Sequence, residues 1–344
     1  MKTVLLTGAD GVVGSEVRRQ LRAYAPSLAV VGTSRRGPES PDRVRWDIGR
    51  EPAPPRVAGP WDVIVHTAAS TRWTMTRSEA VDANVVTTRA VLALAGPRTH
   101  LVHVSTAYVG GHRSPEDLVS DEFEGYRNGY EWSKALCEQL VTDEHGERLT
   151  VVRPPLILGR RGDGGIERFS GPYTLLQSLV SGLAAVVVGD PAGYAEIAPV
   201  DEVANAVVDA VRGPAAGRRL EVIAAGEGSL RLADLLSVAC TTLNTWRAAR
   251  GIAPITAPPI VATSRWRRFF LPLARLELSE VQNHAVELLG MFESYTSLSE
   301  PFTPTRTVTD PAAVLERSVW RWADTRPRLA GRIPESWALV PAGS

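Results

Sequence analysis

The chain has 344 residues, of which 44% are hydrophobic and 22% are charged, and its 38 basic and 38 acidic residues give a net charge of zero. This composition is typical of a soluble globular protein with one large or two interleaved domains. The charge balance gives no electrostatic argument for binding nucleic acid or an anionic membrane surface. No apolar stretch approaches the ~20 residues that span a bilayer, and the first predicted strand begins at Thr3, which leaves no room for a signal peptide. The two cysteines and six histidines lack metal-ligand spacing, so we expect a cytoplasmic protein without a metal site.

Short apolar runs alternate with amphipathic stretches in the first half of the chain, which predicts βαβ units and a parallel sheet. Helices are expected between these runs, and the Gly-rich, charged stretch 160–171 is expected to be a mobile loop. A further helix is expected to open at Asp201, with Asp201 as its N-cap. The expected strands are 3–7, 29–33, 63–67, 100–105, 149–158, 185–189 and 220–224, and the expected helices are 14–24, 78–95, 130–143 and 173–182. From residue 229 onward the pattern is mostly helical and rich in tryptophan.

A glycine-rich turn, TGADGVVG at 7–14, follows the first strand and opens the first helix. Gly8 permits the tight turn, Gly11 permits close approach of a diphosphate, and Gly14 permits close packing of helix on strand. This context predicts a dinucleotide-binding turn.

The end of the second strand decides which dinucleotide is expected. An acidic residue there would bind a ribose 2′-hydroxyl, whereas this chain has Ser34, Arg35 and Arg36, whose hydroxyl and guanidinium groups suit a 2′-phosphate. The sequence therefore favours NADP(H). Asp47, after the next apolar run, is a candidate for binding the adenine amino group.

Tyr130 and Lys134 carry the strongest catalytic signal. The chain has 36 arginines and only one other lysine, Lys2, and the four-residue spacing puts the phenol and the ammonium on one face of a helix. A nearby positive charge is expected to lower the pKa of the phenol and make it a better proton donor. Thr106, at the end of the 100–105 strand, is expected to bind a substrate carbonyl oxygen.

In this order the motifs TGxxGxxG, a Ser/Thr strand end and YxxxK resemble the extended short-chain dehydrogenase/reductase family. Finer strings resemble its fatty acyl-CoA reductase and thioester reductase branch, the male-sterility-type NAD-binding group, over residues 1–225. Asn84 falls where that group has a structural asparagine, although VTT at 86–88 replaces the usual glycine pattern. The strings are HTAASTRW at 66–73, VSTAYV at 104–109, RPPLI at 153–157, GP at 171–172 and IAPVDEVAN at 197–205.

This resemblance implies an α/β fold, a Rossmann doubly wound parallel sheet with a smaller, mostly helical substrate-binding C-terminal domain. The NADP-binding domain is expected at 1–158 and 199–226, and the substrate-binding or lid region at 159–198 and 227–344. The catalytic residues would be Thr106, Tyr130 and Lys134, with Lys134 also bonding the nicotinamide ribose. The expected cofactor-binding residues are Gly8, Gly11, Val12, Val13, Gly14, Ser34, Arg35, Arg36, Asp47, Ala68, Ala69, Tyr130, Lys134, Pro154 and Ile157.

The implied function is an NADPH-dependent reductase of an acyl thioester, or of the derived aldehyde, in specialised or lipid metabolism. The acyl substrate would arrive on coenzyme A or on a separate carrier protein, because no carrier domain is recognisable here. Two alternatives stay open: a dehydrogenase, epimerase or dehydratase of a free small molecule, and a non-catalytic NADP sensor. The sequence leaves open the acyl group, the carrier, an aldehyde or alcohol product, the oligomeric state and the role of residues after 230.

Overall fold

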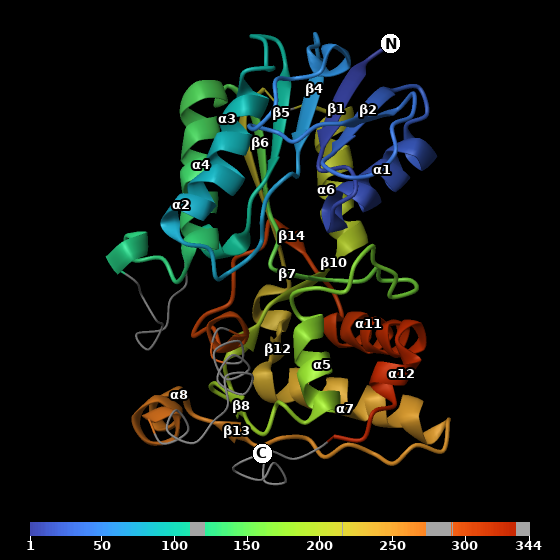
Figure 1. The fold of residues 1–344 in the computed structure, drawn as a ribbon, viewed down its shortest axis with the longest axis vertical. Coiled ribbons are helices and arrows are strands. Elements are labelled where there is room, and N and C mark those ends of the chain that lie inside the picture. The colour runs from blue at the N-terminus through green and yellow to red at the C-terminus, as the bar shows by residue number, and fades with distance from the viewer. Residues whose placement is uncertain (111–120, 215, 273–289, 291, 335–344) are drawn as a thin grey trace.

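An eight-stranded sheet forms one half of the molecule in the computed structural model, which describes residues 1–110, 121–214, 216–272, 290 and 292–334. The strand order is β14-β11-β6-β5-β4-β1-β2-β3, and all of its pairs are parallel. The carboxyl ends of the strands point toward the other, mostly helical half (Figure 1). The strands are β1 (Thr3–Thr7), β2 (Ala29–Ser34), β3 (Arg43–Arg45), β4 (Val63–His66), β5 (His100–Val104), β6 (Arg148–Arg153), β11 (Gly217–Ala224) and β14 (Arg306–Thr307).

Helices cover both faces of this sheet, as the near-continuous apolar character of its central strands requires. On one face α1 (Val12–Tyr24) packs against α6 (Val200–Arg212), with the valines and alanines of α6 buried. The opposite face carries α2 (Arg77–Ala80), α3 (Val86–Leu92) and α4 (Gly129–His145), joined in part by a π-helical turn at Val81–Val85 (Figure 1). The predicted α/β doubly wound fold is confirmed.

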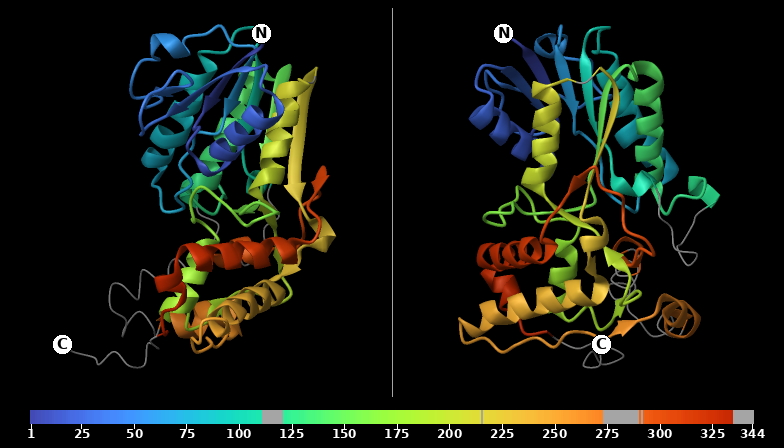
Figure 2. Two further views of the ribbon diagram at one scale, coloured as in Figure 1. Left: turned by 90° about the vertical axis from the view of Figure 1, so that its right-hand side faces the viewer. Right: turned by 180° about the vertical axis from the view of Figure 1, so that it is seen from behind.

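The second half of the molecule has its own apolar core below the carboxyl edge of the sheet (Figure 2). Its short strands pair as β10 with β7 and β13 with β8 in parallel, and β12 with β9 in antiparallel. The strands are β7 (Leu156–Leu158), β8 (Val187–Val188), β9 (Tyr194–Ala195), β10 (Ile197–Pro199), β12 (Leu230–Arg231) and β13 (Ile260–Val261). The helices are α5 (Tyr173–Ser181), α7 (Leu232–Ala248), α8 (Thr263–Arg265), α11 (Pro311–Thr325) and α12 (Pro327–Ala330). Helical turns also occur at Pro55–Val57, Ala107–Gly110, Asp121–Phe123, Gly226–Gly228 and Trp266–Phe270.

Several predicted boundaries are wrong for local reasons. The single strand expected at 149–158 is two strands, β6 and β7, because Pro154 and Pro155 lack the N–H groups that a strand ladder needs. Helix α6 begins one residue before Asp201, which is therefore not its N-cap. The Asp201 carboxylate instead accepts a hydrogen bond from the Arg161 N–H at 3.0 Å.

The loop expected to be mobile is tied to three helices. Arg160 pairs with Glu16 of α1, and Arg161 pairs with Glu202 of α6. From α11, Arg317 donates to the Arg161 carbonyl at 2.8 Å.

None of the helices in the described part of the chain is long and apolar enough to cross a membrane.

Candidate active site

The glycine-rich turn has the geometry that a dinucleotide needs. Gly8 has a positive φ of 70°, and a Cβ atom there would lie 2.8 Å from the Ala68 nitrogen. A Cβ atom on Gly14 would lie 2.1 Å from the Gly8 oxygen, so α1 packs on β1 only with glycine at this position. Gly11 is the N-cap of α1 and provides no side-chain cap, which leaves first-turn N–H groups available to an anion. These features fit a bound dinucleotide diphosphate.

The two hydrophobic residues after Gly11 differ in their surroundings. Val13 is buried in the core, and Val12 is partly exposed in the first turn of α1. Ala68 and Ala69 follow β4, and Ala68 abuts Gly8 while Ala69 is exposed. Their roles as cofactor contacts remain predictions.

A carboxylate that sequence reasoning missed, that of Asp10, lies beside the end of β2. Ser34 is buried, and Arg35 and Arg36 are exposed. Asp10, from the glycine-rich turn, pairs with Arg43 of β3 and lies 3.6 Å from Arg18. The side chains of Asp10, Arg43 and Ser34 all come within 3.8 Å of the place where a Cβ atom on Gly37 would lie, so these three polar groups surround one point. Asp10 could have been noticed, because it interrupts the glycines; the approach of Arg43 depends on the pairing of β3 with β2.

Asp47 lies just beyond β3, at the same edge of the sheet. It is partly exposed, and its main-chain oxygen accepts hydrogen bonds from the N–H groups of Arg50 and Glu51, both at 3.1 Å. The structure therefore brings Asp47 to the correct edge, and its contact with adenine remains a prediction.

Thr106 and Tyr130 meet beyond the ends of β5 and β6, and Lys134 contacts the last residues of β5. Thr106 is 4% exposed, hydrogen-bonds the Tyr130 side chain, and donates to the Pro154 carbonyl at 3.4 Å. Tyr130 lies in the first turn of α4 and Lys134 one turn later. The Lys134 ammonium donates to the Val104 carbonyl at 2.8 Å and lies 3.4 Å from Nε2 of His103.

The electrostatics of Tyr130 differ from expectation. Burial raises the pKa of Tyr130 to about 12, and its hydrogen bond with Thr106 only partly offsets this. The direction is opposite to the predicted one, because desolvation of a phenolate outweighs the hydrogen bond with Thr106 and the Glu131 carboxylate also disfavours the phenolate. Burial likewise lowers the pKa of Lys134. At neutral pH Tyr130 therefore keeps its proton, and the raised pKa makes it a weaker acid than a free phenol.

Helix α4 starts at a fixed point because Asn128 caps it. The Asn128 side-chain oxygen accepts from the Glu131 N–H at 3.1 Å, and its amide group donates to the Tyr295 hydroxyl at 2.7 Å. Tyr295 stacks on Trp73 at a centroid distance of 4.3 Å. Sequence reasoning missed Asn128 and Tyr295, although asparagine before a helical pattern is an N-cap signal.

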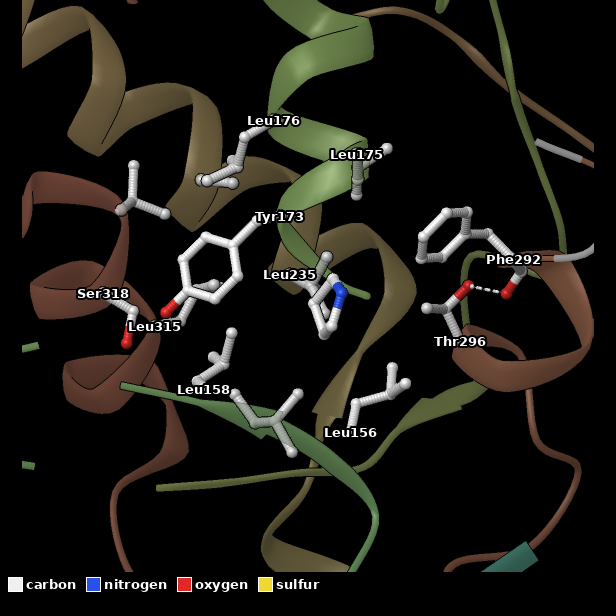
Figure 3. Close-up of a pocket in the computed structure, with 14 residues that line it drawn as sticks. Leu156, Leu158, Tyr173, Leu175, Leu176, Leu235, Phe292, Thr296, Leu315 and Ser318 are labelled. Atoms are coloured by element: carbon white, nitrogen blue, oxygen red, sulfur yellow. Dashed lines mark hydrogen bonds between the residues drawn. The ribbon is translucent and has the colours of Figure 1, made fainter. Parts of the chain in front are cut away.

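The loop after β6 connects this polar cluster to an apolar cavity. Pro154 accepts from the Thr106 hydroxyl and from the Ala107 N–H, Ile157 lies in β7, and Leu156 and Leu158 line the cavity. The cavity is small, about 30 Å³, and its walls come from β7, α5, α7, α11 and the segment at Phe292 (Figure 3).

Leucine supplies six of the 14 residues that line the cavity, and no tryptophan is among them. Trp246 and Trp322 are fully buried in the surrounding core and do not line it. Its few polar groups are engaged: the Tyr173 and Ser318 hydroxyls both accept from the Gly159 N–H, at 3.0 and 3.1 Å. Neither a tryptophan nor Thr106 or Tyr130 is among the residues that line this cavity. Trp337 lies outside the described residues. The apolar cleft expected to face Thr106 and Tyr130 therefore remains a prediction.

Comparison with known sequences identifies this region. Residues 53–207 match the sequence model of an NAD-binding family described as male sterility protein. This stretch is similar to a male-sterility-type NAD-binding domain. It contains Thr106, Tyr130, Lys134 and Pro154 and excludes the glycine-rich turn.

Relatives and solved structures agree with this assignment. Fatty acyl-CoA reductase 1 of Gallus gallus is 30% identical over 178 residues, which cover 42% of this chain and 35% of the relative. The Homo sapiens protein of the same name is 26% identical over 273 residues, or 59% and 53% of the two chains. The chain thus spans about a third to a half of the length of these curated relatives.

The solved structures share the fold of this chain. The terminal R domain from the myxalamid PKS-NRPS biosynthetic pathway matches with a TM-score of 0.67 and 20% sequence identity. The match covers 97% of this chain and 93% of the R domain. The Bordetella bronchiseptica enzyme WbmH, in complex with NAD+, has a TM-score of 0.61 at 18% identity, covering 95% and 99%.

Proposed function

We propose that the protein is an NADPH-dependent reductase of an acyl thioester or of the derived aldehyde. The observation that carries this proposal is the β6–β7 connection: Pro154 accepts a hydrogen bond from Thr106, and Leu156, two residues later, lines the leucine-rich cavity. The cavity of about 30 Å³ has room for no more than one or two water molecules as it stands, so an acyl chain would have to part its leucine side chains to place its carbonyl carbon at the polar cluster. The fatty acyl-CoA reductase relatives support the same substrate class.

In this mechanism bound NADPH supplies the hydride. Tyr130 donates its proton to the developing oxyanion, and Thr106 holds that oxygen through its hydroxyl. Because burial keeps Tyr130 protonated, the phenol is ready to donate at neutral pH. Lys134 would hydrogen-bond the nicotinamide ribose and hold the ribose against α4. With a thioester, collapse of the hemithioacetal expels the thiol and leaves an aldehyde.

The preference for NADPH rests on Ser34, Arg35 and Arg36 at the end of β2. Asp10 opposes it, because a carboxylate near a 2′-phosphate repels it. The pairing of Asp10 with Arg43 offsets that repulsion. Arg43 also places a third guanidinium beside Ser34.

Asp10 also supports a second candidate, an NAD-dependent dehydrogenase or epimerase of a free small molecule. A carboxylate at this position can accept a hydrogen bond from a ribose hydroxyl, and NAD-bound WbmH has the same fold. The apolar cavity argues against this second candidate, because leucine side chains offer no hydrogen-bond partners to the hydroxyl groups of a sugar.

Incubation with either cofactor and a substrate panel separates the candidates. The panel contains acyl thioesters of coenzyme A and of pantetheine, free aldehydes and nucleotide sugars, with products identified by mass spectrometry. The proposal expects NADPH-dependent aldehyde or alcohol from the thioesters. Conversion of a nucleotide sugar with NAD, and of no thioester or aldehyde, would overturn it.

We also propose the division of the chain given by the sequence. Residues 1–158 and 199–226 would bind NADP(H), and residues 159–198 and 227–344 would bind the substrate. The two cysteines, Cys137 and Cys240, are buried and unpaired, in keeping with the proposed cytoplasmic location.

A further inference from the structure

One short helical segment, 292–296, reaches both the apolar cavity and the start of α4. Phe292 and Thr296 line the cavity, and the Thr296 hydroxyl donates to the Phe292 carbonyl at 2.9 Å (Figure 3). Tyr295 lies between them in the sequence and is 1% exposed, and its hydroxyl accepts from the Asn128 amide at 2.7 Å. The segment therefore links a wall of the cavity to the residue that caps α4.

The Tyr295 hydroxyl does more than fill space, since a phenylalanine would supply the same ring. Burial, and then the charge of Glu131, raise the pKa of Tyr295 well above its usual value, so the hydroxyl stays neutral. Asn128 uses both ends of its amide: the oxygen accepts from the Glu131 N–H, and the nitrogen donates to Tyr295. A first helical turn without its cap leaves N–H groups unsatisfied. Tyr295 thus fixes the side chain that fixes this turn, in which Tyr130 lies.

The ring of Tyr295 is held as firmly as its hydroxyl. Trp73 stacks on it at a centroid distance of 4.3 Å and an interplanar angle of 6°. The Arg127 guanidinium lies 4.9 Å from the centroid of the same ring. Arg127 also pairs with Glu131 of α4 at 2.9 Å and donates to the Ser294 carbonyl. Segment 292–296 is therefore attached to the start of α4 at two points, through Tyr295 and through Arg127.

We propose that Tyr295 is a positioning residue for Tyr130: from segment 292–296 it holds the capped end of α4, so that the phenol meets Thr106 only when this segment is docked. The inference rests on the proposed function, in which Tyr130 is the proton donor. Tyr295 acts through Asn128 and has no part in the proton transfer itself. A small displacement is enough, since a misplacement of about 1 Å can lower a rate about 10²-fold. A ligand that moves segment 292–296 would also move the proton donor, which couples substrate binding to the chemistry.

Tyr295→Phe removes the hydroxyl and keeps the ring. We expect kcat with NADPH and an acyl thioester to fall about 10- to 100-fold, and KM for NADPH to stay within about twofold, because the glycine-rich turn is untouched. Tyr108→Phe is the matched control. Tyr108 is also buried and packs edge-to-face on Tyr295 at 4.6 Å, and its hydroxyl donates to the Tyr295 carbonyl at 3.4 Å rather than to α4. Tyr108→Phe should keep the turnover of wild type.

A second variant separates the hydrogen bond from packing. Asn128→Ser keeps a helix cap and removes the amide that reaches Tyr295. It should lose about as much turnover as Tyr295→Phe, and the double variant should be no worse than either, because both changes remove one hydrogen bond. In a Tyr130→Phe background, Tyr295→Phe should add no further loss. Losses that multiply in either combination would mean that Tyr295 acts through packing alone, and would overturn the proposal.

Amide hydrogen exchange measures the link without requiring turnover. The peptide that covers the first turn of α4 should exchange faster in Tyr295→Phe than in wild type, and the peptide that covers α1, on the other face of the sheet, should not change. Unchanged exchange in the first turn, or an unchanged kcat in Tyr295→Phe, would overturn the positioning role and leave the proposed function intact. If wild type reduced no thioester or aldehyde, the proposed function would fail, and the exchange would still decide whether Tyr295 holds α4.

Discussion

The polar cluster at the sheet edge and the leucine-lined cavity beneath it are built from different kinds of contact. The cluster is fixed by main-chain oxygens, those of Val104 and Pro154, and by a capped helix. The cavity is formed by side chains from several elements that are spread over residues 156–319. Hydrogen bonds are directional, whereas apolar contact scales with area. In the proposed reaction the chemistry would therefore depend on a few atoms, and the size of the accepted substrate would depend on many apolar side chains.

The largest effect should come from the phenol of the cluster. We expect Tyr130→Phe to keep cofactor binding but to lose turnover by roughly 10²–10⁴-fold, the usual contribution of a general acid. Steady-state rates with NADPH and an acyl thioester measure it.

Tyr126→Phe is the matched control, because Tyr126 lies four residues earlier and has no lysine at the corresponding offset. It should retain turnover. If Tyr126→Phe were inactive and Tyr130→Phe active, the proton donor would be wrongly assigned.

The second effect concerns cofactor choice, which Arg35 and Arg36 after the end of β2 are proposed to determine. Replacing Arg35 and Arg36 by alanine should weaken NADPH binding by about 1.5–3 kcal/mol per charged bond lost, with little change for NADH. Fluorescence titration of both cofactors measures this.

Asp10→Asn sharpens the same test. If the 2′-phosphate binds beside Ser34, removing the carboxylate should favour NADPH over NADH. Equal affinity of the unmutated protein for the two cofactors would contradict the proposed specificity.

The sequence predicted the sheet edge better than the cavity, for a physical reason. Strand β1 has the predicted bounds because a short buried run between turn residues has few alternatives. Thr106, Tyr130 and Lys134 converge as expected because local spacing and strand order determine their positions. Strand β14 was missed, because it is two residues long and pairs with β11 about 80 residues away.

The pKa of Tyr130 could not be predicted from spacing either. Position along a helix does not reveal how much water reaches the phenol, and burial determines the direction of the shift. The leucines of the cavity gave no signal, since leucine is common in every helical core. Asp10 and Arg43 meet only after β3 has paired with β2.

Acid should destabilise the sheet region through its buried histidines. Burial lowers the pKa of His66 to about 3, and lowers that of His103 in the same direction. Since the unfolded chain binds these protons near pH 6.5 and the folded chain does not, stability is complete above pH 6.5. It falls with decreasing pH by about 1.4 kcal/mol per unit for each such histidine.

Urea unfolding between pH 7 and pH 5 measures this slope. The window lies above the titration of Asp42, whose pKa is lowered to about 2 by hydrogen bonds from Ser40 and Arg22. His66→Asn should show a shallower slope than wild type, whatever its stability at pH 7. Identical slopes would mean that His66 is not buried as a neutral ring.

The smallest effect should come from the cavity. Ala239 of α7 is buried and lines it, so Ala239→Val fills part of the space that an acyl chain would occupy. We expect the preferred acyl chain to shorten by one or two carbons, at about 0.8 kcal/mol for each methylene that no longer fits. The ratio of kcat/KM across a series of acyl lengths measures the shift.

Ala210→Val on α6 is the matched control, since Ala210 is equally buried but packs in the core against α1 and the sheet. Both variants should cost some stability through overpacking, and only Ala239→Val should change the length profile. A profile that moves equally in both, or in neither, would mean that the acyl chain lies elsewhere.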